Sequence, residues 1–95
     1  METRTDLESA IRLQVKQAWL NQQESSKRLD VAVEILEQAE QNLKVARNRY
    51  KEGVGINTEV LDAESLRTRS QSNYNNAHYD TVLSRIQLMR ALGNL

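Results

Sequence analysis

The chain has 95 residues, with 13 basic and 13 acidic side chains, no proline and no cysteine. A formal net charge of zero gives no electrostatic reason to bind nucleic acid or an anionic membrane surface. The absence of cysteine excludes disulfide bonds and cysteine-based zinc sites. No apolar run reaches about 18 residues, and the first residues lack the apolar core of a secretory signal. As given, the polypeptide would stay in the cytoplasm unless a signal had been removed or left out.

The first expected element is a helix over about residues 5–52, with Asp6 as its candidate N-cap. Such a helix would be on the order of 70 Å long. Large and small positions alternate along it at spacings of three and four, which is typical of the seam of a left-handed coiled coil. The large series is Val15, Gln22, Leu29, Leu36, Leu43 and Tyr50, and the small series is Ala18, Ser25, Ala32, Ala39 and Ala46.

A second helix is expected over about residues 58–92, with its own small series of Ala63, Ser70, Ala77, Ser84 and Ala91. When the two small series are paired in opposite directions, the residue numbers of every pair add up to 109. The chain should therefore fold back between Val54 and Gly55. The sequence predicts an all-α fold, an antiparallel two-helix coiled-coil hairpin forming one domain over residues 1–95. Small residues that face each other would let its helices pack closely.

The expected tip of this hairpin is the turn at residues 53–57. Gly53 suits the left-handed residue that follows a helix end, and Asn57 or Thr58 can cap the next helix. Basic residues end the first helix and acidic residues begin the second, which suits both helix dipoles. We expect weak, solvated ion pairs across the hairpin between these two groups. The groups are Lys44, Arg47, Arg49 and Lys51 on the first helix, and Glu59 and Asp62 on the second.

Further apolar residues fall outside the seam on both helices. A helix with more than one apolar face usually has more than one helical neighbour. Two explanations stay open, namely several neighbours in a larger assembly or a rod that dimerises in solution. The residues concerned are Tyr79, Val82, Ile86 and Met89 on the second helix, and Leu13, Leu20, Val31, Ile35 and Val45 on the first.

The sequence contains no convincing catalytic, cofactor or metal site. The single histidine, His78, is expected on the surface, and Asp80 lacks the spacing of three or four residues that a helical metal pair needs. The glycines at the tip are too few for a phosphate loop. We therefore expect a protein that is not an enzyme and that uses no cofactor.

Three stretches together resemble the outer-membrane efflux protein (TolC) family. They are R-Y-K-E-G-V-G-I-N-T-E-V-L-D-A-E at the turn, S-N-Y-N-N-A-H-Y-D in the second helix, and the closing L-M-R-A-L-G-N-L. The resemblance covers about residues 7–95, and its closing segment is similar to the end of the second of the family's two internal repeats. Because the chain has no strands for a barrel, we expect it to be a piece of a larger channel protein.

The resemblance implies a trimeric efflux or type I secretion channel with a long helical barrel in the periplasm. The tips of its hairpins would form the channel entrance and dock a periplasmic adaptor (membrane fusion) protein, which links the duct indirectly to an inner-membrane transporter. Such tripartite pumps contribute to multidrug resistance. The adaptor-contact residues implied by position are Gly53, Val54, Gly55, Ile56 and Asn57.

The resemblance also gives Tyr50 the place of a tyrosine that helps to close the entrance in some members. Those members carry an arginine shortly after the turn glycine, whereas this chain has Gly55, Ile56 and Asn57 there. Tyr50 is equally the last large residue of the seam. Two other functions are compatible with a coiled-coil hairpin, namely the hairpin of the adaptor itself and an unrelated coiled-coil scaffold or RNA-binding arm. An RNA-binding arm should carry a basic stripe, which zero net charge and alternating signs do not favour.

Overall fold

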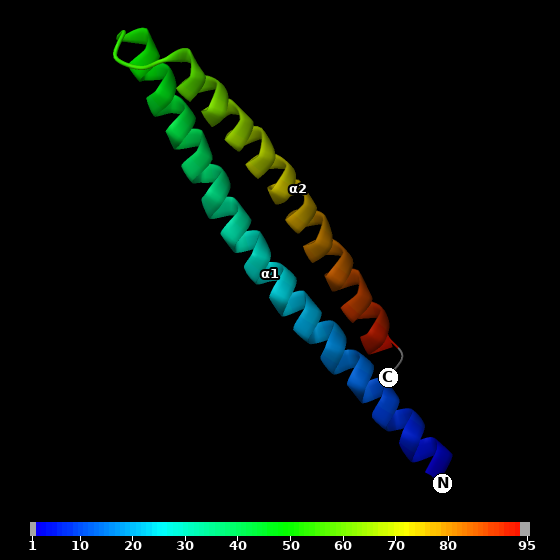
Figure 1. Ribbon diagram of the computed structural model, residues 1–95. Helices are drawn as coiled ribbons and strands as arrows, with labels where there is room; N and C mark the ends of the chain where they lie inside the picture. Colours follow the sequence, from blue (N-terminus) through cyan, green and yellow to red (C-terminus); the bar gives the residue numbers. More distant parts are fainter. Residues whose placement is uncertain (1, 94–95) are drawn as a thin grey trace.

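The computed structural model describes residues 2–93, with side chains from residue 7 onward, and consists of two helices. Helix α1 spans Glu2–Lys51 and helix α2 spans Asn57–Gly93. They run antiparallel as a hairpin, and the amino-terminal end of α1 extends beyond the end of α2 (Figure 1). The hairpin measures 78 × 14 × 13 Å. The predicted fold class is confirmed, and so is a rod on the order of 70 Å.

The helix bounds differ by a few residues from those expected. Helix α1 is already helical at Glu2, so Asp6 lies within it and the predicted N-cap was wrong. No glycine or proline precedes Asp6, so nothing in the local sequence stops the helix there. Helix α2 begins at Asn57, one residue earlier than expected. Its first turn is closed by a backbone bond in which the Glu59 N–H donates to the Ile56 carbonyl at 3.1 Å.

The end of α1 is a Schellman turn built around Gly53. The Val54 N–H donates to the Arg49 carbonyl at 3.0 Å, and the Gly53 N–H donates to the Tyr50 carbonyl at 3.1 Å. Gly53 has a φ of 78°, in the left-handed region that favours glycine. The predicted left-handed helix end at Gly53 is thereby confirmed. Both bonds satisfy carbonyls that the helix end would otherwise leave without partners.

Gly55 is required for a different reason, because it lies close against the helix end. Its N–H also donates to the Arg49 carbonyl, at 3.0 Å. A Cβ atom added at Gly55 would lie 3.1 Å from the Arg49 Cβ and 3.2 Å from backbone atoms of Arg49 and Tyr50. The turn is therefore fixed by one glycine that needs its backbone angle and one that needs its small size.

The contact between the helices is made mainly by small and hydroxyl-bearing residues. Ala39 and Leu43 are the buried hydrophobic residues, at 1% and 6% exposure. Four polar residues are equally buried, namely Ser25, Ser70, Thr81 and Ser84. The other members of the two small series are half-buried: Ala18, Ala32, Ala46, Ala63, Ala77 and Ala91. The ten residues of the two small series, here called the seam, are thus all buried or half-buried.

Candidate interaction surfaces

The described part of the chain offers no group of histidine or acidic residues that could hold a metal ion. His78 is exposed, and its ring lies 6.1 Å from that of Tyr74, measured between centroids. This places the single histidine on the surface, as expected.

The tip presents apolar side chains to solvent on a rigid turn. Val54 and Ile56 are 67% and 61% exposed, and the neighbouring glycines hold the backbone close to the end of α1. The structure brings the five tip residues named from the sequence together at one end of the rod. Leu61, in the first turns of α2, is also 53% exposed and was not singled out from the sequence. Two apolar residues on a fixed turn, with Leu61 nearby, form a surface suited to another protein.

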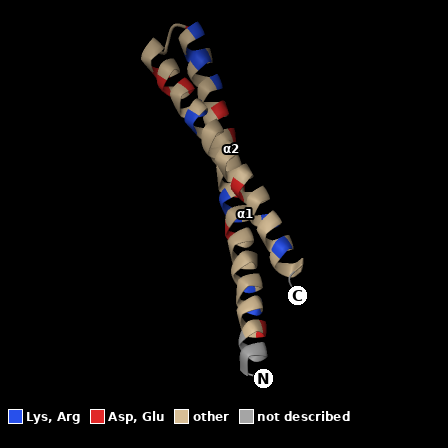
Figure 2. Cartoon of the chain, turned by 90° about the vertical axis from the view of Figure 1, so that its right-hand side faces the viewer, with Lys and Arg blue, Asp and Glu red and all other residues tan. Residues whose placement is uncertain are grey.

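Charges of opposite sign face each other on the two helices just behind the tip (Figure 2). Arg47 pairs with Glu64 at 3.3 Å, and Arg49 approaches Glu59 at 4.0 Å. Ion pairs across the hairpin were expected, but Glu64 rather than Asp62 is the second acidic partner. A further pair joins Arg67 to Glu40 at 3.9 Å. All these side chains are about half exposed, so each pair stabilises the hairpin weakly.

Tyr50 lies beside these pairs but is not part of the buried contact. It is 51% exposed, whereas Leu43, one heptad earlier in the same series, is 6% exposed. Tyr50, Leu43, Lys51 and Val60 help to line an open groove of about 650 Å³ at this end of the hairpin. The phenol is therefore accessible to a neighbouring chain.

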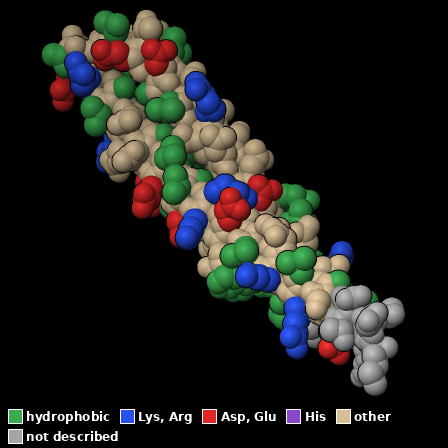
Figure 3. Space-filling model, turned by 60° about the horizontal axis from the view of Figure 1, so that its bottom comes forward, with side chains coloured by type: hydrophobic (Ala, Val, Ile, Leu, Met, Phe, Trp, Pro, Cys, Tyr) green, Lys and Arg blue, Asp and Glu red, His purple; other side chains and the backbone are tan. Residues whose placement is uncertain are grey.

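The outer faces of both helices carry the large apolar residues. On α2, Tyr79 and Met89 are 66% and 65% exposed, and Val82 and Ile86 are 42% exposed. Residues two and five positions after a seam residue point away from the other helix, because each residue turns the helix by about 100°. All five off-seam residues named on α1 are exposed as well. Hydrophobic side chains appear along one face of the rod and at its tip in Figure 3.

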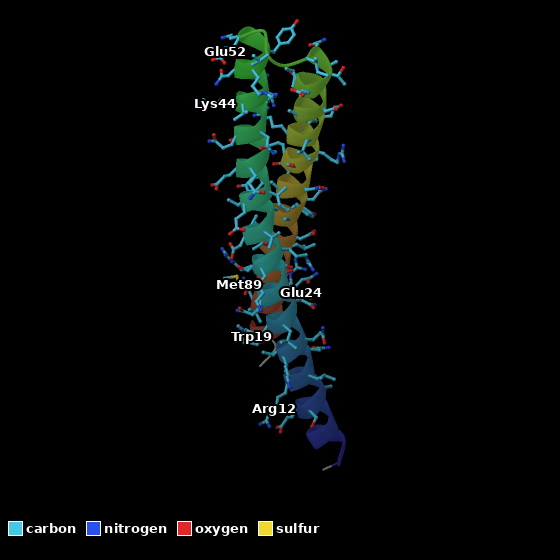
Figure 4. All side chains as sticks on the ribbon, turned by 60° about the vertical axis from the view of Figure 1, so that its left-hand side comes forward. Arg12, Trp19, Glu24, Lys44, Glu52 and Met89 are labelled. Atoms are coloured by element: carbon cyan, nitrogen blue, oxygen red, sulfur yellow. The ribbon has the colours of Figure 1, made fainter. Side chains whose placement is uncertain are left out.

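A further apolar surface, not recognised from the sequence, lies near the open end of the hairpin. Trp19 is 50% exposed and lines a groove of about 380 Å³ with Leu88 and Leu92. Along the rod, Trp19 lies nearer the amino-terminal end of α1 than Met89, which is level with Glu24 (Figure 4). Trp19 belongs to neither heptad series, so the periodicity of the sequence does not mark it as an interaction residue.

A long two-helix hairpin with an apolar tip and exposed apolar side chains on its outer faces is the arrangement of a protein-interaction element. The family model for outer membrane efflux proteins matches residues 2–94, and the chain belongs to this family. It is therefore part of an outer-membrane efflux channel, a class of transport proteins rather than enzymes, and the resemblance seen in the sequence is confirmed. No curated protein and no solved structure gives a significant match. Neither helix, over the described residues, has an apolar stretch long enough to cross a membrane.

Proposed function

We propose that this chain is the periplasmic helical hairpin of a trimeric outer-membrane efflux or type I secretion channel. Its tip docks the helical hairpin of a periplasmic adaptor protein and forms part of the channel entrance. Through the adaptor, the channel is linked to an inner-membrane transporter in a tripartite pump. The family assignment supports the channel rather than the adaptor as the source of the hairpin.

The observation that carries the proposal is the exposed apolar turn. Val54 and Ile56 protrude from a backbone held by three hydrogen bonds between residues 49–50 and 53–55. A rigid apolar surface loses little conformational entropy when it binds, so it is suited to docking. The ion pairs behind the tip have both partners on this chain, which leaves the apolar turn as the principal contact.

Side-by-side packing of hairpins is supported by the heights of the outer apolar residues. The residue numbers of Leu20 and Met89 add up to 109, and those of Val31 and Tyr79 to 110. These two pairs of exposed apolar residues therefore lie at matching heights along the rod. Hairpins with aligned tips would bring the α1 face of one against the α2 face of the next, as the wall of a helical barrel requires.

Tyr50 is proposed to contribute to closure of the entrance. Its exposed ring lies in the last turn of α1, next to the tip. The two nearby arginines, Arg47 and Arg49, already face Glu64 and Glu59 of the same hairpin. Closure would then depend on contact of the ring with a neighbouring hairpin rather than on an arginine after the turn glycine.

The proposal is tested by titrating the hairpin with the adaptor protein of the same organism. Val54→Asp should weaken binding at least about tenfold, because it places a charge in an apolar contact. Val45→Asp is the matched control, since Val45 is a valine of α1 that is 55% exposed away from the tip. Circular dichroism should show equal helicity in both variants.

Undiminished binding by Val54→Asp would overturn the assignment of the tip. Equal losses in both variants would contradict a contact confined to the tip.

A further inference from the structure

Three buried hydroxyl groups connect the helices in one layer, far from the tip. The Ser25 and Ser84 Oγ atoms lie 3.0 Å apart, which is a hydrogen bond. The Thr81 hydroxyl lies 3.1 Å from the Ser25 carbonyl and 2.9 Å from the Ala77 carbonyl of its own helix. Arg28 donates to the Ser25 Oγ at 3.1 Å. Ser25, Thr81 and Ser84, here called the hydroxyl layer, are 2%, 6% and 8% exposed.

Apart from this layer, the seam fits equally well in several registers, meaning alignments of the two helices that differ by one heptad. Small residues recur every seventh position on both helices, so a slip by one heptad again places small against small. The serines do distinguish the registers. After a slip of seven residues, Ser25 would face Ala77 or Ala91, and Ser84 would face Ala18 or Ala32. In either case, the Ser25–Ser84 bond is lost.

We propose that the hydroxyl layer sets the register in which the two helices pair along the rod. A buried polar group that finds its partner in only one alignment disfavours the others, since a hydroxyl buried against alanine loses its cross-helix bond. The pair Ala39 and Ser70, two heptads nearer the tip, makes no cross-helix hydrogen bond in the described part of the chain, so it contributes packing without this selection. The layer thereby keeps Leu20 at the height of Met89, and Val31 at the height of Tyr79.

The glycine turn at the tip also restricts the register, so the experiment must relax it. Seven glycine and serine residues inserted between Val54 and Gly55 would allow the helices to shift by one heptad in either direction. The layer is then removed by Ser25→Ala, Thr81→Val and Ser84→Ala. The matched control is Ser65→Ala, Thr68→Val and Ser72→Ala, which removes the same groups from exposed positions of α2.

Register is measured by crosslinking, which the absence of natural cysteines permits. One cysteine replaces Ala39, and a second replaces Ser70 for the observed register or Ala63 or Ala77 for the slipped registers. The two cysteines are oxidised to a disulfide, which forms only where their Cα atoms lie within about 7 Å, a separation shorter than the heptad rise of about 10 Å. In the lengthened hairpin and its control, the 39–70 crosslink should exceed the others about tenfold. Without the layer, the slipped crosslinks should rise to a comparable yield.

Slipped crosslinks that stay rare after removal of the layer would overturn the proposal, as would slipped crosslinks that are already abundant with the layer intact. If circular dichroism shows that the triple replacement is unfolded, Ser25→Ala with Ser84→Ala replaces it, and the same outcomes decide. These crosslinks report packing within one chain. Their failure is therefore separate from a failure of the proposed adaptor docking.

Discussion

The seam and the outer faces of this hairpin reverse the usual distribution of residue size. Between the helices, alanine, serine and threonine are buried, whereas the outer faces expose residues such as Leu13, Tyr79 and Met89 to about 66%. In a globular domain, large apolar side chains supply most of the burial. The difference leaves most of the large apolar side chains of this hairpin outside the contact between its two helices.

This distribution also explains why the helices can approach closely over their length. Small residues at the contact let the backbones come together, and the hydroxyl groups of Ser25 and Ser84 can meet directly only at such a distance. On the outer faces, side-chain size is not restricted by the other helix. Two kinds of surface with different tolerance to substitution therefore run along each helix.

The largest expected effect comes from placing a large residue in the seam. Ala39→Leu should lower the free energy of unfolding by about 1–3 kcal/mol, because Ala39 is 1% exposed and has no space for three added carbons. Gln38→Leu, at the neighbouring exposed position, should change it by less than about 0.5 kcal/mol. Urea denaturation followed by circular dichroism measures both.

A leucine tolerated equally at both positions would show that the seam has no special need for small residues. The comparison between the two surfaces would then fail.

The next largest effect on stability is expected at the turn that joins α1 and α2. Gly53→Ala should lower the free energy of unfolding by about 1–2 kcal/mol, because a residue with a Cβ atom resists a φ of 78°. Gly93→Ala is the control, since a Cβ atom there meets nothing within 4 Å and its φ is not in the left-handed region. Thermal unfolding of the two variants checks this difference.

Equal stability of Gly53→Ala and the unaltered hairpin would mean that the turn adopts another backbone conformation in solution. The proposed docking surface at Val54 and Ile56 would then have a different shape.

The hairpin and its turn could be predicted because two strong patterns coincide. Small residues that recur every seventh position fix which helix faces meet, and the mirrored numbering of the two series predicts the turn between Val54 and Gly55. Glycine is also the residue that a left-handed helix end demands. The burial of both Ser25 and Ser84 follows from the same arithmetic, so their hydrogen bond could have been anticipated.

Other features of the structure could not be predicted from the spacing of residues in the sequence. No residue before Asp6 prevents helix formation, so α1 begins at Glu2 and Asp6 does not cap it. The choice of Glu64 over Asp62 as a partner of Arg47 follows from the rotation of α2 relative to α1, which a linear charge pattern does not contain. Trp19 went unrecognised because it lies beside the seam rather than in it.

The smallest expected effect belongs to the ion pairs at the edges of the contact, between the seam and the outer faces. Arg47 and Glu64 are 56% and 45% exposed, so water already solvates both charges. Glu64→Gln should lower the free energy of unfolding by only about 0.2–0.5 kcal/mol, and 1 M salt should remove most of that difference. Glu34→Gln is the control, because Glu34 is an exposed glutamate of α1 without an ion pair in the described structure. A loss above about 1 kcal/mol that persists in salt would assign these edge pairs to the buried contact. The buried contact would then include Arg47 and Glu64, although their side chains are about half exposed.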